Sequence, residues 1–191
     1  HGAEPVHGQA RRRRLTAAAS ECVPMSEPTD TTFPLGVQRV RAVLAERGHP
    51  HAPVMLSDAA RTAQQAADAL GVALGQIAKS IIFRRKSDGA AVLVITSGDR
   101  RVDEKKVAAL VGALGRADAD FVKAQTGFSI GGVAPLGHVV PPVALIDREL
   151  FRFAEIWAAA GHPHAVFRLT PADLERLTGA PVADVVAEVA A

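Results

Sequence analysis

The sequence is poor in cysteine and in aromatic residues, and it lacks long hydrophobic runs. Its one cysteine, Cys22, excludes an internal disulfide and a cysteine-rich metal site, and it fits a reducing cytoplasm. Aromatic residues make up 4% of the chain and hydrophobic residues 48%, so alanine, valine and leucine must fill most of the core. No hydrophobic run approaches the roughly 18 residues that a membrane-spanning helix needs, which argues against a membrane partner. With 191 residues, the chain suits one domain with a substantial core.

Several catalytic motifs are missing as well. The chain contains neither a Gly-x-Ser-x-Gly nucleophile elbow nor a phosphate-binding loop that ends in Gly-Lys-Ser/Thr. Residues 127–132 do not form the dinucleotide fingerprint Gly-x-Gly-x-x-Gly. Two His-Pro-His triplets, at 49–51 and 162–164, raise the hypothesis of a metal site, but no carboxylate or cysteine completes a ligand spacing. We therefore interpret these histidines as turn residues and predict neither a metal nor a cofactor.

The excess positive charge is confined to the N-terminal segment. Residues 1–24 contain four arginines, at 11–14, and two glutamates, and they show no periodicity. Such a segment could be an organelle-targeting sequence or an RNA-binding arm, but a flexible extension is the preferred interpretation. We predict a disordered extension over residues 1–33 and one folded domain over residues 34–191. The chain after residue 24 carries 18 basic and 18 acidic residues, so any contact with nucleic acid must rest on local patches.

Hydrophobic periodicity predicts many short strands mixed with about four helices. The helices are expected to run from Pro34 to Gly48, from a cap at Ser57 or Asp58 to Gly71, over 103–114, and onward from Thr170-Pro171. The strands are expected at 54–56, 77–84, 90–96, 119–122, 143–147, 155–159 and 165–169, with Asp88-Gly89 as the turn of a hairpin. This mixture indicates a single compact α/β domain with a mixed, curled sheet and surrounding helices.

A glycine-rich loop spans residues 126–138 and also carries large hydrophobic residues, which a disordered linker rarely does. Glycines at Gly131, Gly132 and Gly137 would let a ligand approach bare backbone N–H groups, and Pro135 would stiffen the loop. Two interpretations stay open at this point. The loop is either a rigid cradle that binds an anion or a carbonyl oxygen through its N–H groups, or a tight turn between buried elements.

Lys79 interrupts an otherwise hydrophobic strand over 77–83. Strand alternation places it on one face with Ile77, Ile81 and Phe83, where a lysine either faces a cavity or extends its ammonium to the rim. Basic clusters follow the two strands of the hairpin and could contact phosphates or simply be solvated. These clusters are Arg84, Arg85 and Lys86 after the first strand, and Arg100, Arg101, Lys105 and Lys106 after the second.

Taken in order, these motifs resemble a known family. They are the strand lysine Lys79, the segment 96–103, the loop 126–137, Asp147, and Ala160-Gly161 before a last strand. Over about residues 36–186 the sequence resembles the YbaK family, the aminoacyl-tRNA deacylases related to the inserted editing domain of bacterial prolyl-tRNA synthetases. The resemblance implies a compact α/β domain with a curled mixed sheet. It also implies trans-editing, the hydrolysis of the ester that joins a wrong, small amino acid to a tRNA, most often a proline tRNA.

The resemblance further implies roles for particular residues. The family lysine, here Lys79, orients the terminal adenosine through its phosphate or sugar, and the loop 131–135 holds the aminoacyl group by backbone contacts. No protein nucleophile or metal is needed, because a hydroxyl of the terminal ribose helps to activate the water. The implied substrate-binding residues are Thr126, Gly127, Gly131, Gly132, Val133, Ala134, Pro135, Gly137 and His138, and the implied tRNA contacts are Arg84, Arg85, Arg100, Arg101 and Lys105.

The expected partners are the aminoacylated 3′ end of a tRNA and a prolyl-tRNA synthetase, in the cytoplasm, with no DNA and no membrane partner. Family members carry specific polar side chains in the region of the last strands. In this sequence the same region, residues 158–166, is largely apolar, so the amino acid that is removed is not assigned. Two functions remain open. The protein is either a free-standing deacylase or a non-catalytic relative that binds tRNA ends or a small acyl anion.

Overall fold

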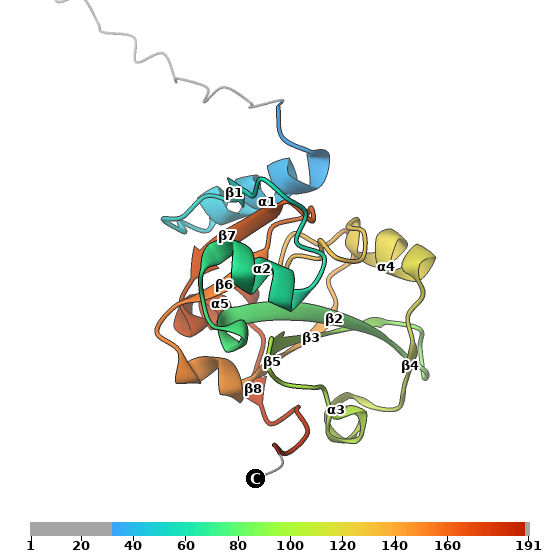
Figure 1. The fold of residues 1–191 in the computed structure, drawn as a ribbon. Helices are drawn as coiled ribbons and strands as arrows, with labels where there is room; N and C mark the ends of the chain where they lie inside the picture. Colours follow the sequence, from blue (N-terminus) through green and yellow to red (C-terminus); the bar gives the residue numbers. More distant parts are fainter. Residues whose placement is uncertain (1–31, 190–191) are drawn as a thin grey trace, which may run out of the picture.

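The computed structural model of the protein describes residues 32–189. The centre of the fold is the predicted hairpin, in which β2 (Ile77–Arg85) and β3 (Ala91–Ser97) pair antiparallel from Ala78↔Ser97 to Arg84↔Ala91 (Figure 1). Gly89 turns the chain with φ +71°, a left-handed conformation that favours glycine. All residues of β3 are buried, so this strand is the interior of the sheet.

The sheet has eight strands and is mixed, as predicted. Its order is β1-β7-β6-β2-β3-β5-β8, and β4 also pairs with β2. The pairs β2–β6, β3–β5 and β5–β8 are parallel, and the other pairs are antiparallel. The remaining strands are β1 (Val54–Met55), β4 (Leu114–Arg116), β5 (Val143–Asp147), β6 (Ile156–Ala159), β7 (Ala165–Leu169) and β8 (Val182–Ala183).

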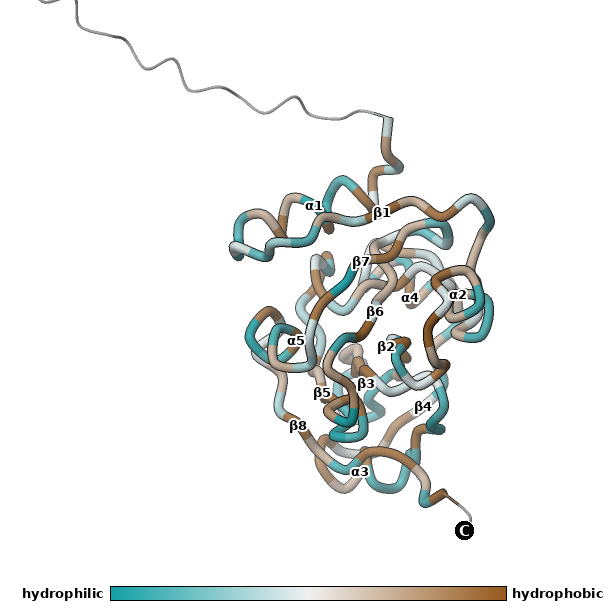
Figure 2. Tube along the Cα trace, turned by 60° about the vertical axis from the view of Figure 1, so that its left-hand side comes forward, coloured by the Kyte–Doolittle hydropathy of each residue, from teal (hydrophilic) through white to brown (hydrophobic). Residues whose placement is uncertain are grey.

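Five α-helices cover both faces of this sheet. They are α1 (Leu35–Glu46), α2 (Ala63–Leu70), α3 (Glu104–Val111), α4 (Ala119–Thr126) and α5 (Pro171–Thr178), with 3₁₀ turns η1 (Leu74–Gln76) and η2 (Arg148–Arg152). Apolar residues of α1, α4 and α5 pack in the main core against one face of β3, which presents Leu93 and Ile95 there. On the other face, α3 packs over Val92 and Val94, and α2 packs over Ile77 of β2. Hydrophobic residues accordingly gather along the central strands, while hydrophilic positions lie on the outer helices and turns (Figure 2).

Local capping explains where several helices begin and end. Thr62, rather than the predicted Ser57 or Asp58, caps α2, because its hydroxyl accepts the Gln65 N–H in a capping box. Gly71 ends that helix in the left-handed conformation, as predicted. The predicted cap Thr170 and the proline at the first helical position start α5.

Two further expectations about elements are wrong. Residues 119–122 begin the helix α4 rather than a strand, because the Asp118 carboxylate caps it by accepting the Phe121 N–H. The helix expected over 103–114 ends at Val111, since Gly112 leaves helical geometry with φ +100°. Leu114 then opens the unpredicted strand β4. The short strand β8 was not predicted either.

The first helix begins at Leu35, close to the predicted start of the folded domain at residue 34. The extension predicted for residues 1–33 lies almost entirely outside the described residues. Within residues 32–189, no helix has the length and hydrophobicity needed to cross a membrane.

Candidate functional site

A cavity of about 300 Å³ lies where β2 and β6 part. The two parallel strands pair only at Ile77↔Trp157 and Ala78↔Ala158, whereas β4 pairs with the far end of the same edge of β2, from Phe83 onward. Residues 79–82 of β2 therefore have a strand partner on one edge only. Crevices beyond the carboxyl ends of parallel strands are common ligand sites in α/β sheets. The gap creates such a crevice in the middle of the sheet.

Lys79 lines this cavity and is partly buried. It lies on the face between the areas covered by α2 and α3, as the alternation of β2 predicts. Burial lowers the pKa of Lys79 below its ordinary value, and the carboxylates of Asp99 and Asp147 partly offset this. An anionic group in the cavity would replace the lost hydration of the ammonium. Of the two alternatives, a lysine that faces a cavity or one that extends its ammonium to the rim, the structure shows the first.

Two other residues that line the cavity each carry a buried polar atom without a hydrogen-bond partner in the described part of the chain. Ser80 Oγ and Trp157 Nε1 both belong to residues that line the cavity, and neither makes a hydrogen bond within the described chain. An indole N–H can only donate, whereas a serine hydroxyl donates and accepts. Because a buried donor without a partner costs about 1–3 kcal/mol, these groups fit a ligand that brings oxygen acceptors.

The rest of the cavity wall is mostly apolar. Side chains from β2, β6 and β7 form its floor, and the glycine-rich loop and the segment before α2 form its rim. The floor includes Ala78, Ala158, Ala165 and Val166, and the rim includes Arg61, Ile130, Gly131, Val133 and His162. A small apolar pocket with a few polar groups can hold a short side chain and fix its orientation.

The glycine-rich loop is a rigid segment packed against the turn at residues 161–163. The Gly132 N–H donates to the Ser129 carbonyl at 3.0 Å, so it closes a turn and is not available to a ligand. A Cβ at Gly132 would lie only 2.8–2.9 Å from backbone atoms of His162. The glycine is therefore required for close packing of two backbones, which corrects the expectation that its N–H lines a cradle.

Several predicted substrate-binding residues line neither this cavity nor the second one described below, and their interactions are internal. Thr126 is buried, and its hydroxyl contacts the Val122 carbonyl and accepts the Phe128 N–H. The His138 ring contacts the Ala134 carbonyl at 2.7 Å, and burial, with Arg39 nearby, lowers its pKa while that hydrogen bond opposes the shift. The structure places Ala134 in the main core, and Pro135 and Gly137 belong to the same packed segment. Only Gly131 and Val133 of the predicted set line the Lys79 cavity.

A second cavity of about 500 Å³ lies beside the first. Arg61, Ile130 and His162 line both cavities, so these residues mark their common border. Gly127 and Gly132 of the predicted set line the second cavity, together with Lys123 and Ser129. Burial and the neighbouring His164 lower the pKa of His162, which favours a neutral imidazole at this border.

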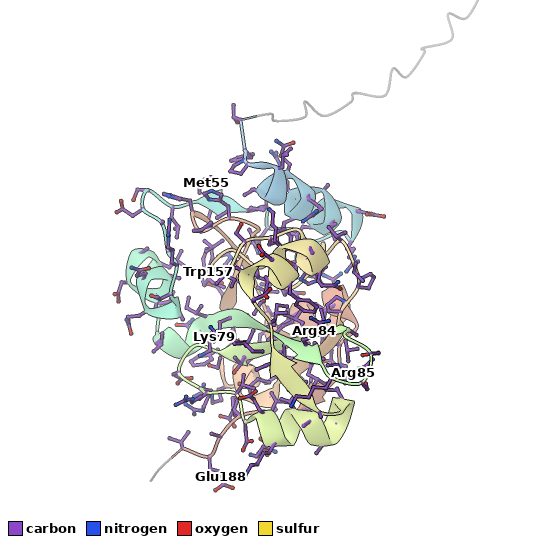
Figure 3. The ribbon with its side chains drawn as sticks, turned by 90° about the vertical axis from the view of Figure 1, so that its right-hand side faces the viewer. Met55, Lys79, Arg84, Arg85, Trp157 and Glu188 are labelled. Atoms are coloured by element: carbon purple, nitrogen blue, oxygen red, sulfur yellow. The ribbon has the colours of Figure 1, made fainter. Side chains whose placement is uncertain are left out.

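The predicted tRNA contacts do not gather around the cavities. Arg84 and Arg85 lie at the other end of β2 from Lys79, about 17–20 Å away at the rise of a strand (Figure 3). The Arg84 guanidinium lies over the Phe121 ring, and Arg85 pairs with Asp88 at 2.7 Å. Arg101 and Lys105 are exposed and have no side-chain ion pair within residues 32–189. The predicted tRNA contacts of these four residues remain predictions, because none of them lines either cavity.

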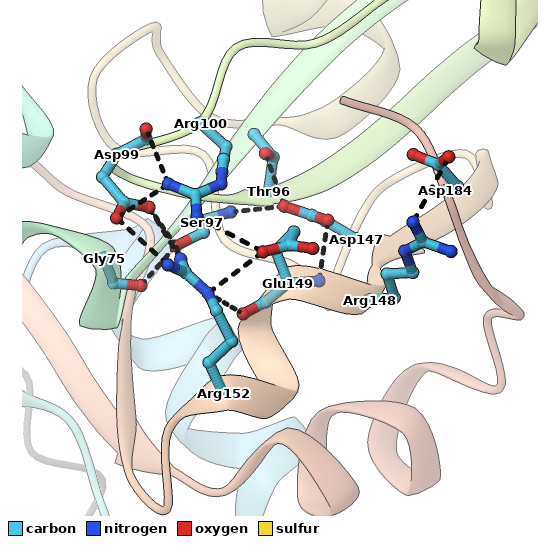
Figure 4. Close-up of polar contacts among 10 residues, drawn as sticks. All are labelled: Gly75, Thr96, Ser97, Asp99, Arg100, Asp147, Arg148, Glu149, Arg152 and Asp184. Atoms are coloured by element: carbon cyan, nitrogen blue, oxygen red, sulfur yellow. Dashed lines mark hydrogen bonds and ion pairs between the residues drawn. The ribbon is translucent and has the colours of Figure 1, made fainter. Parts of the chain in front are cut away.

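Arg100 belongs to a polar cluster at the end of the hairpin (Figure 4). It pairs with Asp99 at 3.1 Å and with Glu149 at 3.4 Å, so its charge is already compensated. Asp147, which is fully buried, accepts hydrogen bonds from the Thr96 hydroxyl and the Ser97 N–H. This cluster fixes β3 against β5 and supplies the negative charge that acts on Lys79.

Three residues of the site could not be recognised from the sequence. Trp157 alternates in an ordinary strand, and Arg61 precedes a helix cap, so neither position stands out. His162 was assigned to a turn, which is correct for its backbone, but the ring also lines both cavities. No group of three or more potential metal ligands occurs in the described part of the chain.

Comparisons with known proteins identify a family and related folds. The sequence model of the aminoacyl-tRNA editing domain family matches residues 57–177. The uncharacterized protein YwhH of Bacillus subtilis (strain 168) is 36% identical over 118 residues, which cover 61% of this chain and 74% of YwhH. A proline–tRNA ligase of Thermoanaerobacter sp. (strain X514) is 30% identical over 94 residues, which cover 47% of this chain but 16% of the ligase.

Two solved structures share the fold along nearly their whole length. One is a candidate trans-editing enzyme for prolyl-tRNA synthetase, with 42% identity and a TM-score of 0.77 over 82% of this chain and 100% of that chain. The other is the hypothetical protein APE2540, with 29% identity and a TM-score of 0.73 over 78% of this chain and 99% of that chain.

Proposed function

Because the chain belongs to the aminoacyl-tRNA editing domain family, as its motifs indicated, we propose that it is a free-standing trans-editing deacylase. Its substrate would be a tRNA, specifically a proline tRNA, that carries a wrong, small amino acid. The mischarged tRNA would come from a prolyl-tRNA synthetase, in the cytoplasm where translation occurs. The observation that carries this proposal is the partly buried Lys79 in a small apolar cavity beside two unpartnered polar groups.

In this proposal the cavity receives the aminoacyl ester and the terminal ribose. The Lys79 ammonium, deprived of water by burial, binds the terminal phosphate or sugar and so fixes the ester in position. Trp157 Nε1 and Ser80 Oγ, which lack hydrogen-bond partners within residues 32–189, would donate to oxygen atoms of the substrate. The position of the ester strongly affects the rate of hydrolysis, because a displacement of about 1 Å can lower the rate on the order of 100-fold.

The reaction would be a direct hydrolysis. A water molecule adds to the ester carbonyl carbon, the bond to the ribose oxygen breaks, and that oxygen takes up a proton. Within residues 32–189, Ser80 has no hydrogen bond to a base, so it lacks the activation that a serine nucleophile requires. In line with the family resemblance, we assign the activation of water to a hydroxyl of the terminal ribose, and to the protein the positioning of the ester.

The size and chemistry of the pocket favour a small side chain. Its floor offers methyl groups from Ala78, Ala158 and Ala165, and its charged lining residues are Lys79 and Arg61. A volume of about 300 Å³ is at the lower end for ligand pockets, which span roughly 300–1,000 Å³. One methylene changes selectivity in an apolar pocket by only about 1–3 kcal/mol, so a graded preference among small amino acids is expected.

The experiment is a deacylation assay on proline tRNA charged with alanine, serine, cysteine, threonine or proline. We expect turnover of at least one small amino acid and a lower kcat/KM for correctly charged proline. Failure to hydrolyse any of these esters above the uncatalysed rate would overturn the proposal. Tight binding of the charged tRNA without hydrolysis would instead identify a binding module.

A further inference from the structure

The second cavity differs in chemistry from the Lys79 cavity. Two cationic side chains, Arg61 and Lys123, line it, and no carboxylate does. The Arg61 guanidinium makes no hydrogen bond or ion pair within the part of the chain that the structure describes. The cavity therefore presents uncompensated positive charge and favours an anionic ligand.

Lys123 is held at the wall of this cavity. Its Nζ donates to the Gly127 carbonyl at 3.0 Å, at the C-terminal end of α4. An ammonium has three N–H donors, so this bond fixes the head group while leaving donors for a ligand. The exposed hydroxyl residue Ser129 lines the same wall and adds a further hydrogen-bonding group.

The opposite wall is made of backbone. Gly36 and Gly161 pack against each other so closely that a Cβ on Gly161 would lie 2.5 Å from the Gly36 carbonyl oxygen. Leu35 and Ile130 at the cavity are 83% and 61% exposed, so apolar surface is available beside the cations. A ligand with both a phosphate and a flat apolar ring system matches this combination.

The two cavities adjoin and share part of their lining. Arg61, Ile130 and His162 line both, so a ligand in the first cavity that extends past them enters the second. An aminoacyl-tRNA end has this form, since the RNA chain continues from the terminal adenosine through a phosphodiester. A volume of about 500 Å³ suits a ligand of nucleotide size, within the range of roughly 300–1,000 Å³ of known pockets.

We propose that the second cavity binds the RNA chain on the 5′ side of the terminal adenosine, with Arg61 and Lys123 contacting phosphates. This inference rests on the proposed function, because it takes the Lys79 cavity to hold the aminoacyl end. It assigns RNA contact to residues around the cavity, whereas the distant Arg84 and Arg85 would not touch the last nucleotides.

The test uses the RNA trinucleotide cytidylyl-cytidylyl-adenosine, which carries no amino acid, and the full chain. Lys123→Gln is compared with the control Lys86→Gln, which changes an exposed lysine in the turn after β2. We expect Lys123→Gln to weaken trinucleotide binding about threefold at low salt, the order of an exposed charge contact. The slope of log affinity against log salt should fall by about 0.7, the value for one phosphate contact on a single strand. Lys86→Gln should bind as the parent does.

Equal affinity of the parent and Lys123→Gln for the trinucleotide, with an unchanged salt slope, would overturn the inference. An equal loss of affinity for adenosine, which has no phosphate, would also overturn it. The measurement involves no hydrolysis, so its outcome is independent of the deacylation assay. Lys123-dependent binding without deacylation would refute the proposed reaction alone, and deacylation without Lys123-dependent binding would refute the second cavity alone.

Discussion

Replacement of Gly132 by alanine tests how the glycine-rich loop shapes the site. Its backbone has no positive φ, so alanine is not excluded by the conformation of the chain. The added Cβ would instead lie 2.8–2.9 Å from the N, Cα and C atoms of His162, closer than Cβ contacts in proteins. Backbone atoms in a packed turn cannot rotate away, so the loop and the turn must separate.

The cost follows from this geometry. Overpacking a well-packed interior costs typically about 1–3 kcal/mol, and contacts with backbone belong to the upper part of that range. For a domain of this size, a loss of about 2–3 kcal/mol lowers the melting temperature by about 4–12 °C. Because Ile130, Gly131 and Val133 line the Lys79 cavity, movement of the loop should also reduce kcat/KM about 10- to 100-fold.

Thermal unfolding and deacylation are measured on Gly132→Ala beside the control Gly48→Ala. Gly48 has φ +70° with nothing within 4 Å of a Cβ, so its substitution should cost about 1 kcal/mol and leave deacylation unchanged. A Gly132→Ala variant with the parent's melting temperature would refute the close packing of loop and turn. A destabilised variant with full activity would show that this packing does not shape the site.

Trp157→Phe keeps an aromatic six-membered ring but removes the pyrrole part of the indole with its N–H, which has no partner within residues 32–189, so deacylation should fall about tenfold and the lost volume should lower the melting temperature slightly; unchanged kinetics would contradict substrate contact. Burial lowers the pKa of His138 in the folded protein, so as pH falls the unfolded chain binds a proton at this histidine before the folded protein does. The free energy of unfolding should therefore decrease as pH drops below about 6.5. Melting temperatures at pH 7.5 and 5.5 check this, and His138→Gln should lessen the difference; equal pH dependence in both proteins would refute it. Deletion of residues 1–24, which lack hydrophobic periodicity, should leave melting and deacylation unchanged, and a drop of several degrees would show that they contact the domain.

Much of the fold could be predicted because its signals are local. The Asp88-Gly89 turn between two apolar runs specified the central hairpin, and Thr170-Pro171 specified the start of α5. Residues 119–122 were assigned to a strand because four residues cannot distinguish the two periodicities. In the structure, Asp118 caps the helix α4, but in the sequence alone an aspartate at this position is just as typical of a turn.

The site was only partly predictable, because it depends on long-range pairing. The sequence singled out Lys79, but the cavity exists because β6 and β4 pair with separate parts of one edge of β2. Thr126 and His138 belong to a conspicuous loop, yet their polar atoms bond to backbone within it. Arg61 and Trp157 are unremarkable in sequence and reach the site through the fold alone.

In the proposed reaction, Lys79 positions a mischarged tRNA end for hydrolysis. Lys79→Met keeps the length and apolar bulk of the side chain and removes its charge. Because burial lowers the pKa of Lys79, the charged form is disfavoured in the folded protein, and Lys79→Met should melt at the same temperature or higher near neutral pH.

The decisive measurement is kcat/KM of parent and Lys79→Met on the small amino acid that the parent removes fastest from proline tRNA. We expect a loss on the order of 100-fold in the folded variant. Deacylation by Lys79→Met at the parent's rate would contradict it, and so would unfolding of the variant, since Lys79 would then be a structural residue.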